Sequence, residues 1–298
     1  MASVATNDNT PAVEGGAIKR VSKLPYPGKF EDINRIASEV LSPQDAFDGF
    51  KCEVSGMSSN QFQFSHAFHM GQSEETPKYA LTTVFSDETN PPTAIGKVDS
   101  DGKVFGRFIT ATLGGRMFIS GTVNINKDFQ TYLGGEIEHK HPTQNIVVKY
   151  DANNTFAAGY IRSITKRWAG GLEITRSPAQ RLFMYTLGVR YNRGPNSYVF
   201  TANNYAQAAM TYSFKKANAE LATELQMMLG QTGLASKLSV GLRYGFTQQV
   251  FKIRADTEGT VVGMYEEKLT PSFRISFCST LNYFTNDFKF GIGLSISR

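Results

Sequence analysis

The sequence predicts an all-β fold, a transmembrane β-barrel of about 19 strands, preceded by one short helix. Three observations support this prediction. Apolar and polar residues alternate with a period of two from residue 49 to residue 298. This stretch provides roughly 19 strands if each strand with its turn takes about 13 residues. No run approaches the roughly 18 consecutive apolar residues of a membrane-spanning helix, so the strands are expected to cross the membrane.

The composition suits many half-buried strands and excludes some functions. The chain has 298 residues, of which 12% are aromatic and 27 are glycine. Its formal net charge of +5 is too small for the dense basic surface of a nucleic-acid-binding protein, so no nucleic acid partner is expected. The two cysteines, Cys52 and Cys278, lie far apart and do not form the disulfide framework of a small secreted domain. No secretory signal precedes the strands, which argues against a bacterial outer-membrane porin.

The N-terminal part divides into two predicted segments. Residues 1–28 mix Ala, Thr, Asn, Gly and Pro without periodicity, so we expect a flexible arm. Residues 29–42 place Phe30, Ile33, Ala37 and Val40 at helical spacing, with acidic residues in the first turn. This pattern predicts an amphipathic helix that ends at Ser42, before a proline.

The remaining residues, 49–298, are predicted to form the barrel. Between residues 61 and 70, Phe62, Phe64, Phe68 and Met70 share one face of a strand, and the last strand alternates in the same way. A soluble sandwich or lipocalin-like barrel would turn such an apolar face inward, whereas a membrane barrel turns it toward lipid. A closed sheet of this size is too wide for side chains to fill, which favours a polar, water-filled lumen.

Several stretches resemble a known family, the pore-forming subunit of the translocase of the outer mitochondrial membrane. The similar stretches extend from about residue 25 to the end and comprise residues 26–33, 47–51, 56–66, 159–165 with Trp168, Gly170, Gly171 and Glu173, and 259–269. The resemblance implies a 19-stranded barrel whose first and last strands pair in parallel. It also implies that the helix lies in or against the lumen.

The same resemblance implies a function and partners. The expected function is passage of unfolded precursor proteins, with their basic presequences, through the outer mitochondrial membrane. The expected partners are a single-span receptor, small single-span subunits, a second copy of the barrel and membrane lipid. The closest alternative is a voltage-dependent anion or metabolite channel of the same superfamily. An alternative from another class is a soluble β-rich binding protein.

The C-terminal strand carries a candidate membrane-insertion signal. Lys289, Gly291, Leu294 and Ile296 fit the pattern polar-x-Gly-x-x-apolar-x-apolar by which mitochondrial barrel proteins are recognised for insertion. Such a strand can pair by its edge with an insertase sheet while its apolar side faces lipid.

Catalytic and metal-binding patterns are weak. His139 and His141 share a strand face, but no third ligand at suitable spacing accompanies them, so no metal or other cofactor is expected. His66 is expected to pack or to form a hydrogen bond. The sequence has no phosphate-binding glycine loop, no nucleophile elbow and no cysteine with a nearby histidine, so an enzyme is not predicted.

The candidate binding residues are carboxylates on the polar faces of strands: Glu53, Glu136, Glu138, Glu173, Glu220 and Glu224. One interpretation is that they pair with lumenal bases and stabilise the wall, the candidates being Arg107, Arg190, Arg243, Lys252, Arg254 and Arg274. The other is that some form an electronegative track, which would attract basic targeting peptides by weak interactions at several sites. Glu173 is the strongest candidate for the track because it alone lies in a stretch that resembles the family.

Overall fold

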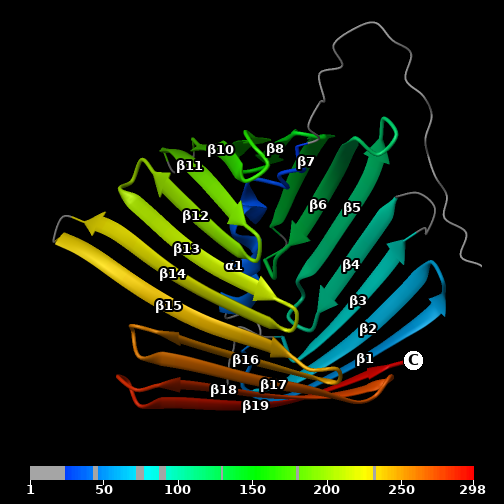
Figure 1. Ribbon diagram of the computed structural model, residues 1–298. Helices are drawn as coiled ribbons and strands as arrows, with labels where there is room; N and C mark the ends of the chain where they lie inside the picture. The colour runs from blue at the N-terminus through cyan, green and yellow to red at the C-terminus, as the bar shows by residue number, and fades with distance from the viewer. Residues whose placement is uncertain are drawn as a thin grey trace, which may run out of the picture.

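A computed structural model of the chain describes residues 24–42, 46–71, 77–86, 92–128, 130–178, 181–230 and 233–298. These residues form one closed sheet of 19 strands around a short helical segment (Figure 1). The strands are β1 (Gly49–Ser59), β2 (Phe62–Met70), β3 (Tyr79–Ser86), β4 (Thr93–Asp99), β5 (Val104–Thr112), β6 (Met117–Ile125), β7 (Thr131–His141), β8 (Gln144–Asp151), β9 (Phe156–Ser163), β10 (Trp168–Ser177), β11 (Leu182–Arg193), β12 (Asn196–Asn203), β13 (Gln207–Lys216), β14 (Ala219–Gly230), β15 (Gly233–Gly245), β16 (Gln249–Asp256), β17 (Thr260–Thr270), β18 (Phe273–Asn282) and β19 (Asp287–Ser297). The predicted all-β barrel of about 19 strands is confirmed.

The barrel closes between its first and last strands. All consecutive strands pair antiparallel, whereas β1 and β19 pair in parallel, from Gly49 opposite Gly291 to Ser55 opposite Ser297. An odd number of strands requires this arrangement, because strand direction alternates around the sheet and one pair of neighbours must then run the same way. Closure leaves no unpaired edge in the sheet.

Alternation along each strand separates a lipid-facing surface from a lumenal surface. In β19, the outward side chains of Phe288 and Phe290 are 66% and 59% exposed. Gly291, the residue after Phe290, faces the lumen and is buried. In β7 the outward Leu133 and Ile137 alternate with the lumenal Glu136 and Glu138. Large apolar side chains thus cover the exterior, as a membrane barrel requires. Among the described residues, no helix is both long and apolar enough to cross a membrane.

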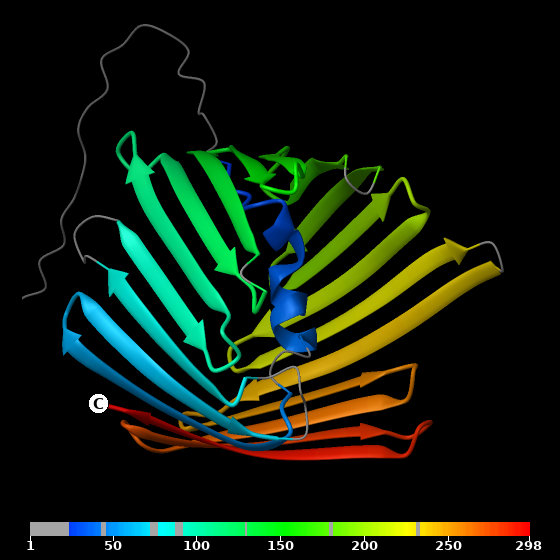
Figure 2. The same cartoon turned by 180° about the vertical axis from the view of Figure 1, so that it is seen from behind.

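The helical segment lies inside the barrel, against the middle strands of the sheet (Figure 2). It begins with a 3₁₀ turn, η1 (Glu31–Asn34), and continues as the α-helix α1 (Arg35–Leu41). The helix α1 packs on β13 to β16, and η1 on β11. Sequence analysis predicted a helix over residues 29–42; Lys29 and Phe30 instead precede η1.

The predicted flexible arm covers residues 1–28, of which 1–23 lie outside the described residues. Residues 24–28 run along the lumenal wall and are held there by hydrogen bonds. We therefore treat residues 24–41 as one unit, the N-terminal segment.

Candidate functional site: the lumen and its N-terminal segment

The wall under the first half of the N-terminal segment combines apolar side chains with glycines. Phe30 and Ile33 are each only 6% exposed and pack with Ile161 and Val199 of the wall. A Cβ atom added to Gly188 would lie 2.9 Å from Cε2 of Phe30 and 3.0 Å from Cδ1 of Ile33. The glycine therefore leaves the space that these two side chains fill.

The second half of the segment docks in the same way. Val40 and Leu41 are buried against Ala222, and an added Cβ at Gly241 would lie 2.9 Å from Cδ2 of Leu41. The guanidinium of Arg254 donates a hydrogen bond of 3.0 Å to the carbonyl oxygen of Leu41. This bond satisfies one of the carbonyl groups that the end of a helix leaves unpaired.

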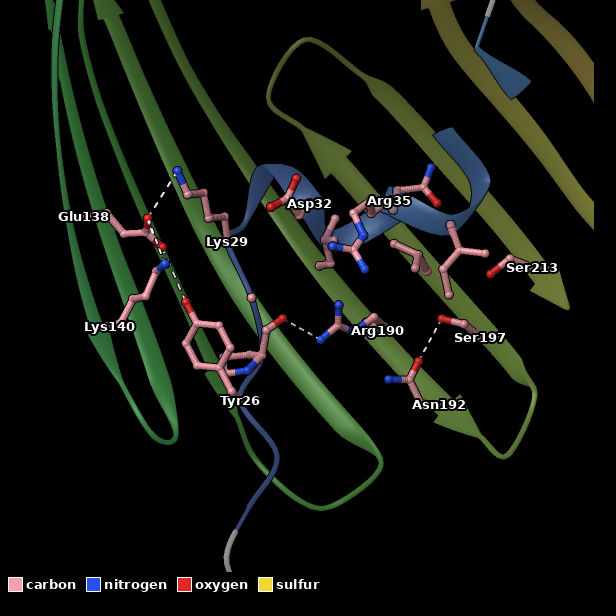
Figure 3. A pocket seen from close by; sticks show the side chains of 16 residues that line it. Tyr26, Lys29, Asp32, Arg35, Glu138, Lys140, Arg190, Asn192, Ser197 and Ser213 are labelled. Atoms are coloured by element: carbon pink, nitrogen blue, oxygen red, sulfur yellow. Dashed lines mark hydrogen bonds and ion pairs between the residues drawn. The ribbon is translucent and has the colours of Figure 1, made fainter. Parts of the chain in front are cut away.

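Side chains of the wall bind the backbone ahead of the helix. The hydroxyl of Ser163 donates to the carbonyl oxygen of Pro25 at 2.7 Å. The guanidinium of Arg190 donates to the carbonyl oxygen of Pro27 at 2.6 Å (Figure 3). The segment is thereby fixed by backbone contacts as well as by its side chains.

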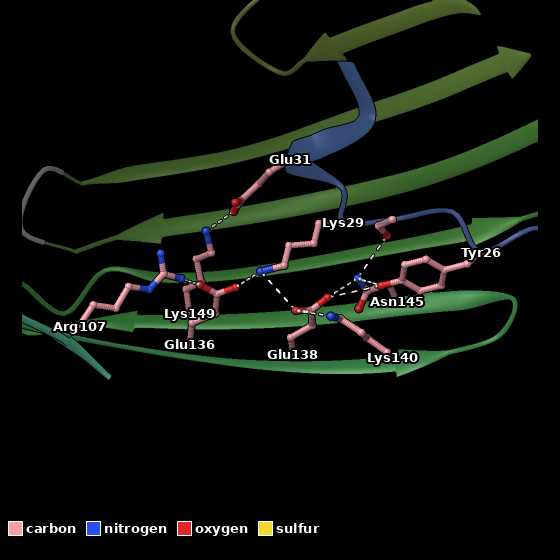
Figure 4. Close-up of polar contacts among 10 residues, drawn as sticks. Tyr26, Lys29, Glu31, Arg107, Glu136, Glu138, Lys140, Asn145 and Lys149 are labelled. Carbon is pink, nitrogen blue, oxygen red and sulfur yellow. Dashed lines mark hydrogen bonds and ion pairs between the residues drawn. The ribbon is translucent and has the colours of Figure 1, made fainter. Parts of the chain in front are cut away.

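A polar cluster on β7 and β8 holds the side chains of the same stretch (Figure 4). The ammonium of Lys29 lies 2.6 Å from a carboxylate oxygen of Glu136 and 3.3 Å from one of Glu138. The amide of Asn145 donates to the hydroxyl of Tyr26 at 2.8 Å and to Glu138 at 2.9 Å. Burial, and next the charge of Glu138, raises the pKa of Tyr26 to about 12. Tyr26 is therefore a neutral phenol at physiological pH.

The six predicted carboxylates all lie on the lumenal face, and four of them form ion pairs. Glu136 and Glu138 bind Lys29, and Glu136 also lies 3.6 Å from Arg107. Glu220 lies 2.6 Å from Lys215 and 3.2 Å from Arg243, and Glu53 lies 4.0 Å from Lys51. Pairing with lumenal bases was one of the two predicted interpretations, and it describes these four residues.

The other two carboxylates, Glu173 and Glu224, form no ion pair with any described residue. Glu173 lies on β10 beside Glu31 of η1, whose own partner is Lys149. Glu224 on β14 accepts a hydrogen bond of 3.0 Å from Gln226. Neither carboxylate is thus held in an ion pair by the described wall, although Lys149 lies near Glu173 and several cations share the cavity of Glu224.

A cavity of about 910 Å³ adjoins the end of the helix, between α1 and strands β14 to β16. Its lining is mostly polar and includes the acidic Glu39 and Glu224 and four basic residues: Lys237, Arg243, Lys252 and Arg254. This part of the lumen is therefore polar, with basic groups in excess of acidic ones.

Comparison with known proteins assigns the chain to a family. The pattern that defines the eukaryotic porins matches residues 26–291, from the N-terminal segment into the last strand. The chain belongs to the eukaryotic porin family. Within that family, this porin is 25% identical over 305 residues to mitochondrial import receptor subunit TOM40 of Saccharomyces cerevisiae, covering 91% of this chain and 78% of the yeast protein.

Further relatives carry related names. Mitochondrial import receptor subunit TOM40B of Rattus norvegicus is 23% identical over 301 residues, covering 93% of this porin and 94% of the rat protein. Among solved structures, a chain from "Asymmetric conductivity of engineered proteins" has a TM-score of 0.50 and 9% identity, over 79% of this porin and 97% of that chain. This last likeness concerns the fold alone.

The predicted insertion signal lies in the closing strand of this porin. Leu294 and Ile296 point outward, whereas Lys289 and Gly291 face the lumen. An added Cβ at Gly291 would lie only 2.4 Å from the carbonyl oxygen of Phe47, so the glycine lets the chain pass close to the seam where β1 begins. Its role in insertion stays a prediction.

The histidines have structural surroundings. His66 shares a hydrogen bond of 2.8 Å with the hydroxyl of Tyr79 on the outer face, as its predicted role requires. His139 and His141 share a face of β7. In the described part of the chain, no group of three or more His, Cys, Asp or Glu side chains is arranged to bind a metal ion.

Sequence reasoning missed the main partners of the carboxylates. Lys29 was assigned to the helix and Tyr26 to the flexible arm, yet both bind the β7–β8 wall more than a hundred residues away in the chain. Asn145 was not singled out. The only available signal was the resemblance of residues 26–33 to the family, which gave no partner for any of these side chains.

Proposed function

We propose that this porin is a protein-conducting channel of the outer mitochondrial membrane, which passes unfolded precursor proteins into mitochondria. The observation that carries this proposal is similarity over more than nine-tenths of the chain to proteins named as mitochondrial import receptor subunits. The closed barrel with its polar lumen supports it, because an extended polypeptide needs a wide path lined by groups that replace water.

Glu173 and Glu224 supply the affinity for basic presequences in this proposal. They lie near the two ends of the helical segment, Glu173 on β10 beside Glu31 and Glu224 on β14 in the cavity beside Glu39, and neither is neutralised by an ion pair among the described residues. Two weak, separate sites attract a polycation without trapping it. Glu136, Glu138 and Glu220 instead fix the wall and the segment.

The apolar exterior accommodates the other proposed partners. A single-span receptor, small single-span subunits and a second barrel copy are expected to pack there, because spanning helices present apolar side chains to the same depth of the membrane. Outward aromatic residues on β10 to β13 form a continuous row that suits a membrane interface: Trp168, Tyr191, Tyr198 and Tyr212.

The proposed function is tested by conductance of the refolded porin in a planar bilayer, with a basic presequence peptide added on one side. We expect voltage-dependent flicker block by this peptide, and little block by a neutral peptide of equal length. Glu173→Gln with Glu224→Gln should shorten the block, whereas Asp287→Asn, at the exposed start of β19, should not. A steady conductance that ignores the peptide would favour the alternative, an anion or metabolite channel.

A further inference from the structure

A second pocket lies beside the start of the helix, with a volume of about 430 Å³ (Figure 3). Its floor is the wall of β11 to β13, which contributes Arg190, Asn192, Ser197 and Ser213. Its other side is the N-terminal segment, from Tyr26 to Ile36. The pocket therefore bridges the docked segment and the barrel.

The charges in this pocket do not balance locally. Lys29 and Lys140 both form ion pairs with Glu138. The other two basic groups that line the pocket are the guanidinium groups of Arg190 and Arg35. Arg35 lies on the exposed side of the helix, 3.5 Å from Glu39. Arg190 forms no ion pair with any described residue; its only hydrogen bond is to the carbonyl oxygen of Pro27.

An unused donor points to an anionic ligand. The Nε atom of Arg190 is buried and has no hydrogen-bond acceptor. Ser213, which is 4% exposed, and Ser197, which donates to Oδ1 of Asn192, add hydroxyl groups to the lining of the pocket. Asp32 also lines the pocket but pairs with neither guanidinium. Arg190 is half-buried and has no counter-ion among the described residues, and a partly desolvated charge of this kind is stabilised by an incoming anion.

We infer that this pocket binds a compact oxyanion, between Arg190 of the wall and Arg35 of the helix. Guanidinium groups bind phosphate and carboxylate through two parallel hydrogen bonds, and hydroxyl groups complete the shell. The bound anion links the segment to the barrel and so strengthens docking of the helix. A free phosphate group and the carboxylate of an acidic side chain offer the same chemistry. This inference does not depend on the proposed function.

Isothermal titration of the detergent-solubilised porin tests the site, with inorganic phosphate in one arm and a short glutamate-rich peptide in the other, at constant ionic strength. We expect saturable binding in at least one arm, and the arm that binds identifies the source of the anion. Arg190→Gln should weaken binding roughly tenfold or more, and Arg35→Gln less, because a charge-assisted hydrogen bond is lost. The Arg190→Lys variant should bind the anion with an affinity between those of the unmodified porin and the Arg190→Gln variant, because lysine keeps the positive charge but cannot donate two parallel hydrogen bonds.

Arg274→Gln is the matched control, because Arg274 is a lumenal arginine that is paired with Glu266 at 3.0 Å and lies outside the pocket. It should bind the anion like the unmodified porin. Ser213→Ala covers the case in which Arg190→Gln disturbs the fold, and it should weaken binding severalfold. Absence of saturable heat in both arms overturns the inference. So does equal binding by the Arg190→Gln, Arg35→Gln and Ser213→Ala variants, provided that each forms a barrel.

Discussion

Replacing Phe30 by alanine should release the N-terminal segment from the wall without opening the barrel. Phe30 is 6% exposed, and its ring fills the space above Gly171 and Gly188. Removing a buried phenylalanine side chain costs about 3–5 kcal/mol, since apolar contact is lost and a cavity remains. The strands keep their hydrogen bonds, so this cost falls on docking of the segment.

The complementary change acts from the wall. Gly188→Ala places a methyl group about 3 Å from Phe30 and Ile33, which is too close for carbon atoms. Overpacking of this kind costs about 1–3 kcal/mol. In the double variant the new methyl group enters the space that the ring has left. The combined cost should therefore fall below the sum of the two single costs by about 1 kcal/mol or more, which is a coupling typical of residues in contact.

Hydrogen exchange of the peptide that covers residues 31–41 measures these costs, in detergent micelles and with mass-spectrometric detection. A loss of about 3 kcal/mol corresponds to exchange roughly a hundredfold faster. Ser38→Ala, on the exposed side of the helix, is the control and should change exchange by less than about twofold. Unchanged exchange in Phe30→Ala would refute this account of docking, as would strictly additive costs in the double variant.

Three further predictions concern the segment and the seam. Tyr26 should ionise near pH 12, measured as the difference between the tyrosinate absorbance titrations of the porin and of its Tyr26→Phe variant. Because the docked state binds this proton more tightly, docking loses stability as the pH rises from 10 to 12. A titration midpoint near pH 10 would contradict the prediction. Lys29→Met should speed chymotrypsin cleavage of the segment roughly tenfold by removing a part-buried ion pair, whereas Lys51→Met, with its exposed and longer pair, should not. Gly291→Ala should reduce the yield of folded barrel on a heat-modifiability gel because its Cβ meets a carbonyl oxygen at 2.4 Å, whereas Gly121→Ala, which meets no atom within 4 Å, should fold normally; equal yields would contradict the steric argument.

The strands were predictable from the sequence because the alternation of apolar and polar residues within each strand shows which side chains face lipid and which face the lumen. A residue that faces lipid and its neighbour that faces the lumen differ in polarity, so the period of two in residues 61–70 or 288–297 needs no knowledge of partners. The count was less well determined. An average length per strand gives only an approximate number, and the odd total and the parallel seam came from the family resemblance.

The contacts of the lumen were predictable only in part. Pairing of Glu136 with Arg107 and of Glu220 with Arg243 joins nearby strands on the lumenal face, β7 with β5 and β14 with β15, so pairing with lumenal bases was among the predicted interpretations. Lys29 reaches Glu136 across 107 residues of sequence. No local pattern encodes such a contact, because it depends on where the segment crosses the lumen.

The position of the segment also constrains the order of assembly. Its contacts are with β7 to β16, and these strands lie in the sheet away from the pair β1 and β19 that closes it. An open, curved sheet therefore already offers the complete docking surface, including the glycines under Phe30. Once β1 has joined β19, a segment left outside would have to thread through a finished ring. We expect docking to precede closure, so that the helix acts during folding as an internal template on which the sheet curves.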